Sequence, residues 1–300
     1  MKKILSLKIV CLIVFAVLFM HCEAQPPLPD MYVDRDAATE RKASFIVKSQ
    51  FLLIDNKIDT KDSIFFPEKS FSDMLHHFAK LSTEPVGLRV VFAQFPENTS
   101  GHVPENWENQ LTILFSPIVA GNHDTEFYFI NDHGNFNPTD NKLSNAEAKL
   151  WISNYENNII PTIKNTINDD DDKNYISIEN RRILSDTKSI DYCAAAIKQF
   201  ADEIKYQNNI HNDQNFITGV RCYFCAYGKR GITLQDGSRH YKKRLIIQLA
   251  ITTKDEEVFD IDTTNRKPKL NACPLAEKVL PKFSSAYDNG QLCPANCPTK

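Results

Sequence analysis

Three stretches of the chain recur later in the sequence, in the same order and with similar residues at matching positions. The most similar pair shares a glycine, an arginine two residues later, and apolar or aromatic residues around them. Repeats spaced this widely are typical of fused or tandem domains, because solenoid repeats recur every ~20–50 residues. The sequence therefore predicts an internal duplication. The pairs are GLRVVFAQF (87–95) with GVRCYFCAY (219–227), LTILFSPI (111–118) with LIIQLAIT (245–252), and EFYFI (126–130) with EEVFDI (256–261).

Each copy has the pattern of a helix, a strand, a second helix and then three strands joined by turns. β-branched and aromatic runs between turn residues predict the strands, and apolar stripes at helical spacing predict the helices. The early helices are expected around Arg35–Ile54 and Ser144–Lys164, and the later ones begin at Ser70 and Ser189 as N-caps. We therefore expect an α+β fold, with helices on one face of a mainly antiparallel sheet.

The first residues have the three parts of a secretory signal peptide: lysines, a short apolar run and a small-residue exit. The apolar run at 9–20 is too short to span a bilayer. Cleavage after Ala24 would remove residues 1–24. The alternative is a lipoprotein with lipidated Cys22, although His21 is larger than the residue that normally precedes such a cysteine. We expect an exported protein of the periplasm, cell envelope or medium, attached to a membrane only if Cys22 is lipidated.

The remaining chain divides into a first α+β repeat at 25–140, a second at 141–265, and a tail rich in cysteine and proline at 266–300. The formal net charge is −3 and the lysines are scattered, which excludes a nucleic-acid partner. With only 9 glycines and 42% hydrophobic residues, the composition excludes collagen-like and disordered chains.

All cysteines that follow the leader lie in the second half of the chain. An even number of them in an oxidising compartment predicts disulfides. Cys193 and Cys222 match apolar core positions of the first copy, Met74 and Val90, so we expect a helix-to-strand bridge between them. Two buried free thiols are the alternative. A bridge from Cys222 to Cys225 is excluded, because side chains three apart on a strand point to opposite faces.

The tail contains Cys293 and Cys297, each followed by proline. We expect these two cysteines to form a local disulfide that closes a very small loop. In the alternative, Cys273 bridges to one of the pair, or these cysteines and a histidine hold a metal. Cys225 would then be unpaired or joined to Cys273.

Arg89 and Arg221 lie at the same position of the two Gly-x-Arg strands, on the sheet face predicted to lack helices. Each arginine either packs its stem on the sheet and reaches solvent or a carboxylate, or binds a carboxylate or phosphate ligand in a bidentate manner. Both interpretations stay open.

The string GNHD at 121–124 resembles the metal-binding element of metallophosphoesterases, but the other motifs of that family are absent. We therefore interpret it as a hairpin turn, since glycine and asparagine suit tight turns. If the loops cluster, His102, His123 and Asp124 could hold a metal, which gives a metal-dependent hydrolase as the alternative function. We expect no cofactor.

The C-terminal run YDNGQLCPANC (287–297) and the Gly-x-Arg strands are similar to those of uncharacterised exported proteins of Bacteroidota that end in a DNGxLCPPxC-like tail. Ala295 replaces the second proline of that pattern. The resemblance implies a cell-envelope location, but it assigns no activity because those proteins are themselves uncharacterised. Our preferred function is a non-catalytic protein that binds an unknown protein or small-molecule partner.

Overall fold

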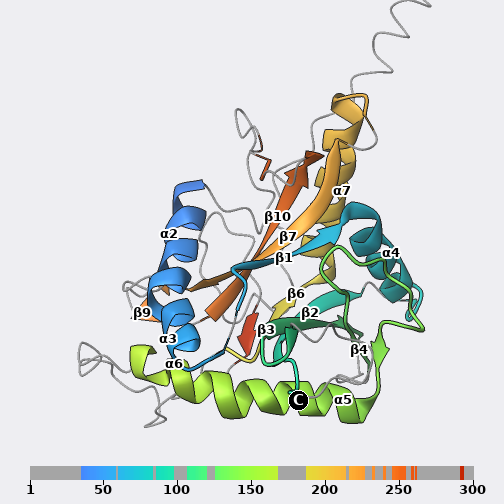
Figure 1. The fold of residues 1–300 in the computed structure, drawn as a ribbon. Coiled ribbons are helices and arrows are strands. Elements are labelled where there is room, and N and C mark those ends of the chain that lie inside the picture. Colours follow the sequence, from blue (N-terminus) through green and yellow to red (C-terminus); the bar gives the residue numbers. More distant parts are fainter. Residues whose placement is uncertain are drawn as a thin grey trace, which may run out of the picture.

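The computed structural model of the chain consists of two antiparallel sheets and a small two-stranded ribbon, with helices packed around them (Figure 1). This confirms the expected α+β class. None of the helices in the described part is long and apolar enough to cross a membrane. The structure describes residues 35–58, 60–83, 86–97, 107–119, 126–167, 187–213, 216–226, 232–233, 239–240, 245–254, 258–259, 261 and 291–293.

The smaller of the two main sheets has the strand order β1-β7-β10, and both of its pairings are antiparallel. Its central strand is β7 (Ile217–Ala226), which contains the second Gly-x-Arg motif. The edge strands are β1 (Ser63–Pro67) and β10 (Leu245–Thr253). In Figure 1, α2 lies to the left of this sheet and α7 to its right, and Phe45 of α2 and Phe200 of α7 both belong to the main core.

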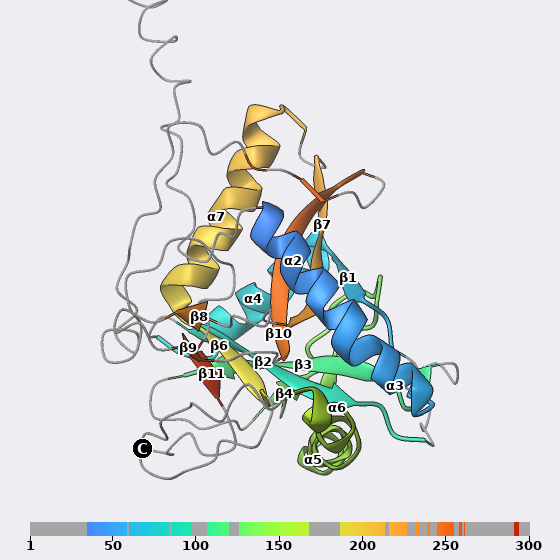
Figure 2. The same cartoon turned by 90° about the vertical axis from the view of Figure 1, so that its left-hand side faces the viewer.

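The larger sheet has six strands in the order β11-β6-β2-β3-β4-β5. Its central strand β2 contains the first Gly-x-Arg motif, and its edge strand β11 comes from the C-terminal tail. Figure 2 shows that β2 and β3 run across the direction of β7 and β10. The strands are β2 (Gly87–Gln94), β3 (Leu111–Ile118), β4 (Phe127–Tyr128), β5 (Lys142–Leu143), β6 (Ser189–Tyr192) and β11 (Gln291–Cys293), and the separate ribbon is β8 (Ile232–Thr233) with β9 (Arg239–His240).

The two early helices lie where the sequence predicts them, and each contains a π-helical turn. Ser144 begins the second one with a reciprocal capping box, in which its side chain and that of Glu147 each accept from the other residue's backbone amide. The first helix comprises α2 (Arg35–Phe45), η1 (Ile46–Gln50) and α3 (Phe51–Asp55), and the second comprises α5 (Asn145–Asn154), η3 (Tyr155–Ile159) and α6 (Ile160–Ile167).

The later helices are α4 (Glu68–Ala79) and α7 (Ala194–Ile210), and their predicted N-caps are wrong. Ser70 lies inside α4, and its hydroxyl donates to the Gly134 carbonyl. Ser189 begins strand β6, so α7 starts only after Cys193. The physical reason is that the apolar residues of β6 fit a pleated sheet as well as a helix, and pairing with β2 satisfies the β6 backbone.

Each half of the chain contributes its first strand to the other half. Strand β1 pairs with β7, which lies far downstream, and β6 pairs with β2, which lies far upstream. In these pairings Phe65 lies opposite Arg221, and Asp191 lies opposite Arg89. Both exchanged strands are followed by a helix and then by a Gly-x-Arg strand. This common order agrees with a duplication, and the duplication itself stays a prediction.

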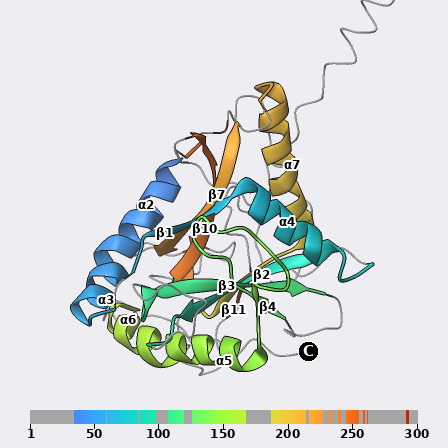
Figure 3. The ribbon, with the colours of Figure 1, turned by 45° about the vertical axis from the view of Figure 1, so that its right-hand side comes forward.

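The predicted repeats 25–140 and 141–265 share one hydrophobic core in the described part of the chain. It includes Phe92 and Phe115 from the first half together with Phe200 and Phe224 from the second. A second cluster, around Trp151 of α5, covers the other face of β2 and β3. Figure 3 shows these strands between α4 above and α5 below. The larger sheet therefore has helices on both faces, which corrects the expectation of a single covered face.

Candidate functional site

Arg89 forms a bidentate ion pair with the residue directly opposite it on the neighbouring strand. Its Nε donates to Asp191 Oδ1 at 2.6 Å, and its Nη2 donates to Asp191 Oδ2 at 2.7 Å. The side chains of Arg89 and Asp191 are only 20% and 11% exposed. This geometry matches the interpretation of Arg89 as a scaffold arginine whose charge is compensated within the sheet.

Arg221 occupies the matching position of β7, but the opposite residue is Phe65 in place of an aspartate. The guanidinium carbon of Arg221 lies 5.3 Å from the centre of the Phe65 ring, within the range of a cation–π contact. Its Nη1 also donates to Ser63 Oγ at 3.3 Å. The aromatic ring supports the cation without supplying a negative charge.

A second cation lies over a second aromatic ring on this sheet. Lys42 Nζ, from α2, is 4.3 Å from the centre of the Tyr223 ring and 3.0 Å from Asp62 Oδ2. Burial opposes ionisation of Asp62, but hydrogen bonds from Lys42 and Ser63 outweigh it and lower the pKa of its carboxyl.

We call this region the Arg221 face, defined by Lys42, Phe65, Arg221, Tyr223 and Gln248. The last three come from the central and edge strands, where Gln248 lies directly opposite Tyr223. Arg221 and Tyr223 are half-buried, whereas the alternate residues of β7 lie in the core. Cys225 and the residue opposite it, Ile246, lie on the same side of the sheet and are buried in the main core, so only part of this side is accessible.

The glycine of the second Gly-x-Arg motif has a specific steric reason. A Cβ atom at Gly219 would lie 2.3 Å from Cε2 and Cζ of Phe65, so the ring of Phe65 lies across the glycine. Only glycine leaves room for this ring, which in turn supports Arg221. Gly219 therefore helps to position Arg221, because it leaves room for the Phe65 ring that contacts the guanidinium.

A turn at 131–134 closes the outer edge of β1 beside this face. Asp132 Oδ1 accepts from the Phe65 amide at 2.6 Å, and the His133 amide donates to the Phe65 carbonyl at 2.9 Å. The His133 ring is centred 4.8 Å from that of Phe65, and its φ of 61° is left-handed. Hydrogen bonds of this kind protect an edge strand from pairing with other chains.

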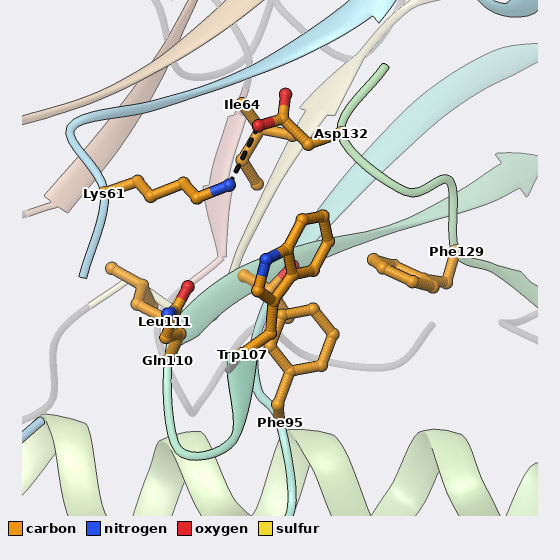
Figure 4. Close-up of a pocket in the computed structure, with 9 residues that line it drawn as sticks. Lys61, Ile64, Phe95, Trp107, Gln110, Leu111, Phe129 and Asp132 are labelled. Atoms are coloured by element: carbon orange, nitrogen blue, oxygen red, sulfur yellow. Dashed lines mark hydrogen bonds and ion pairs between the residues drawn. The ribbon is translucent and has the colours of Figure 1, made fainter. Parts of the chain in front are cut away.

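The cavity next to this turn is too small to hold a ligand (Figure 4). Its volume is about 10 Å³, which is room for about one water molecule. The ion pair between Lys61 Nζ and Asp132 Oδ2, at 2.9 Å, lies on one side of it. The Lys61 ammonium is also 4.2 Å from the centre of the Trp107 ring.

A hydrogen-bonded chain of four side chains was not expected from the sequence. Tyr128 donates to Glu126 Oε2 at 2.7 Å, and Lys142 donates to Glu126 Oε1 at 2.5 Å. Since the Tyr128 proton is committed to Glu126, the contact of 2.9 Å from His77 Nε2 makes that nitrogen the donor to the Tyr128 oxygen. Burial lowers the pKa of His77 and raises that of Tyr128. His76 is exposed and lies outside this chain.

The predicted bridge between Cys193 and Cys222 is wrong. Cys222 is a buried free thiol, and burial raises its pKa. Cys193 is disulfide-bonded, and its partner is neither Cys222 nor Cys225, which are free thiols. It precedes α7 and corresponds to Pro67, which precedes α4, so the match to the core residue Met74 was out of register.

The other cysteine predictions are tested only in part. Cys225 is a buried thiol that donates to Gln248 Oε1 at 3.0 Å, and it does not bridge to Cys222. Cys293 lies in β11 opposite Ser189, which places this part of the tail at the edge of the larger sheet. Cys22, Cys273 and Cys297 lie outside the described residues.

The residues of the alternative metal site, His102, His123 and Asp124, also lie outside the described residues. Within the part that the structure describes, no group of three or more histidine, cysteine, aspartate or glutamate side chains could hold a metal ion. The GNHD string of the expected hairpin turn belongs to the same undescribed loop.

The fold and the geometry define an α+β protein whose candidate site is a partly buried cationic and aromatic sheet face. Comparisons of the chain with protein-family models, curated proteins and solved structures found no match.

Proposed function

We propose that this chain is an exported, non-catalytic protein of the cell envelope that binds a protein or small-molecule partner on its Arg221 face. The observation that carries the proposal is the pairing of cations with aromatic rings at the β1-β7-β10 sheet. The Arg221 guanidinium carbon lies 5.3 Å from the centre of the Phe65 ring, and the Lys42 ammonium lies 4.3 Å from the centre of the Tyr223 ring. Arginine and aromatic side chains are the residues most enriched where binding energy concentrates in interfaces.

Export is proposed from the leader at 1–24 and from the tail resemblance. The form of the partner follows from the geometry of the face. The cavity of about 10 Å³ beside β1 is too small for a ligand, and the proposed partner lies on the sheet face instead. Lys42, Arg221 and Tyr223 offer cationic and aromatic contacts within one patch.

The proposal can be tested by photo-crosslinking in the native host. Benzoylphenylalanine in place of Tyr223 keeps an aromatic ring on the face, and the same residue in place of Lys198 provides a control on α7. Lys198 is exposed, with a side chain that is 75% accessible. We expect an adduct from position 223 that is lost with Arg221→Met and absent from position 198. Equal adducts from both positions, or none from position 223, would contradict the proposal.

A further inference from the structure

Strand β11 of the C-terminal tail is joined to the fold by a short backbone pairing. It has three residues and pairs antiparallel with β6, with Gln291 opposite Asp191 and Cys293 opposite Ser189. It forms one border of the larger sheet, beside β6 in Figure 2. A strand of this length makes few backbone hydrogen bonds, so pairing alone holds it weakly.

Cys193 provides a covalent attachment close to this strand. It follows β6 directly, precedes α7, and is disulfide-bonded. Cys222 and Cys225 are free thiols, so neither is its partner. Once the leader at 1–24 is removed, every other cysteine of the chain lies in the tail at 266–300. The tail therefore contains all the remaining candidates for the partner.

The register of β11 argues against Cys293 as that partner. Cys293 lies opposite Ser189, which is four residues before Cys193 in the chain. At about 3.3 Å per residue along a strand, the Cα atoms of the two cysteines are roughly 13 Å apart. A disulfide requires Cα atoms within about 7 Å of each other. The candidates that remain are Cys273 and Cys297, which lie outside the described residues.

We propose that Cys193 forms its disulfide with Cys273 or Cys297 and so fastens the C-terminal tail, with β11, to the edge of β6. The inference goes beyond the Arg221 face and rests only on the export part of the proposed function. Formation of the bond removes two protons and two electrons from two thiols, and a disulfide of an oxidising compartment accepts them by exchange. The fastened strand covers an edge of β6 that would otherwise be open to strands of other chains.

Peptide mapping of the mature protein without reductant, after alkylation of free thiols, identifies the partner. We expect a Cys193–Cys273 peptide, because this pairing leaves Cys293 and Cys297 for the small loop predicted from the sequence. A Cys193–Cys297 peptide would support the link to the tail and reject the small loop. Cys193 found as a free thiol, joined to Cys293, or joined to a second copy of the chain would overturn the inference.

The backbone of β6 contains its own reference for a second measurement. The Phe92 amide donates to the Lys188 carbonyl, so the backbone groups of Lys188 point to β2. Alternate residues of a strand direct their backbone groups to the same neighbour. The Ile190 amide therefore faces β2, whereas the Asp191 amide faces β11.

Hydrogen exchange of these two amides, followed by ¹H–¹⁵N NMR, tests whether the disulfide holds β11 in place. Reduction with dithiothreitol should speed exchange at Asp191 by roughly tenfold or more, because closing a long loop by a disulfide contributes at least that factor. The Ile190 amide should keep its protection, which shows that the sheet stays folded. In Cys193→Ser, fast exchange at Asp191 should be present without reductant and unchanged by it. Equal protection of Asp191 before and after reduction of the parent would contradict the fastening.

The outcomes separate this inference from the proposed function. Intact mass shows whether the chain begins at Gln25, and a retained leader would reject export while the peptide map still reports the partner of Cys193. A bond from Cys193 to Cys11 or Cys22 in such a chain would overturn the inference. Absence of the adduct at position 223 would reject the binding face alone.

Discussion

At the scale of single residues, the same arginine position has two different electrostatic environments. Arg89 is held by both oxygens of Asp191, whereas Arg221 contacts the ring of Phe65. Each of the two arginine side chains therefore contacts a residue from the other half of the chain. The first contact is an ion pair within the larger sheet, and the second is a cation–π contact at the candidate site.

Removal of the Asp191 carboxylate should destabilise the protein markedly. In Asp191→Asn the guanidinium of Arg89 loses its charged partner in a place where both side chains are largely buried. We expect the free energy of unfolding, measured with urea, to fall by about 2 kcal/mol. Asp202→Asn is the control, because Asp202 forms an exposed i,i+4 pair with Lys198. That change should stay within about 0.5 kcal/mol, and equal effects of the two substitutions would contradict the scaffold role.

His77 should make stability depend on pH. Burial lowers its pKa in the folded protein from the usual value of 6.5, although Glu126 acts in the opposite direction and Lys142 and Lys80 add to the lowering. Between the folded and unfolded pKa values the unfolded chain binds more protons. The contribution of His77 is therefore complete above pH 6.5 and is lost as pH falls below it.

Urea unfolding at about pH 7.5 and about pH 5.5 measures this effect, since the two values lie on either side of the ordinary histidine pKa. His77→Gln keeps a donor for the Tyr128 oxygen and cannot titrate. The loss of stability on acidification should be smaller in this variant than in the parent. The same loss in both proteins would assign the pH dependence to other groups.

Thiol labelling tests the corrected cysteine assignment. Cys222 and Cys225 are buried thiols, and burial raises the pKa of Cys222, so neither should form the reactive thiolate in the folded protein. We expect both to resist alkylation at neutral pH and to react after unfolding without reductant. A disulfide between Cys193 and Cys222 in peptide maps would restore the original prediction and contradict the structure.

At the scale of the elements, strands β1 and β6 show why the predicted starts of the helices that follow them are wrong. The segments SIFFP at 63–67 and SIDYC at 189–193 both precede helices. The sequence pattern around Ser189 fits a helical stripe, but β6 begins there because its backbone pairs with β2. The existence and order of the helices were predictable from periodicity. Their first residues depended on pairing with distant strands.

Gly219→Ala tests how β7 positions the Arg221 face. The new Cβ would lie 2.3 Å from the Phe65 ring, so the ring or the strand must shift. Overpacking of this kind should lower the free energy of unfolding by about 2 kcal/mol, measured with urea. In the background Phe65→Leu, which lacks the ring, the same alanine should cost clearly less. An equal cost in both backgrounds would assign the effect to the Phe66 carbonyl of β1, which would lie 2.8 Å from the new Cβ, and not to the ring.

At the scale of the whole molecule, the exchange of β1 and β6 makes the halves depend on each other. Each half lacks a strand that its own Gly-x-Arg strand requires, and the main core includes residues of both. A fragment would therefore leave apolar surface and backbone groups of the sheet without partners.

Fragments 25–140 and 141–300 should each fail to fold alone and should fold when mixed. Circular dichroism and thermal unfolding measure this directly. We expect no cooperative transition for either fragment, and a cooperative transition close to that of the intact chain for the equimolar mixture. A cooperative transition of one isolated fragment would show that the exchanged strand is dispensable.

The sequence by itself determined the class of fold, the early helices, the Gly-x-Arg strands and the two arginines as related positions. These follow from local periodicity, in which residues near each other in the chain decide whether it coils or extends. Only the tertiary structure decided that Asp191 faces Arg89 across 102 residues, and that Ser63 contacts Arg221 across 158. Such pairings depend on which strands exclude water together, and no short stretch of sequence contains both partners. The charge at the candidate site is therefore a property of the assembled sheet.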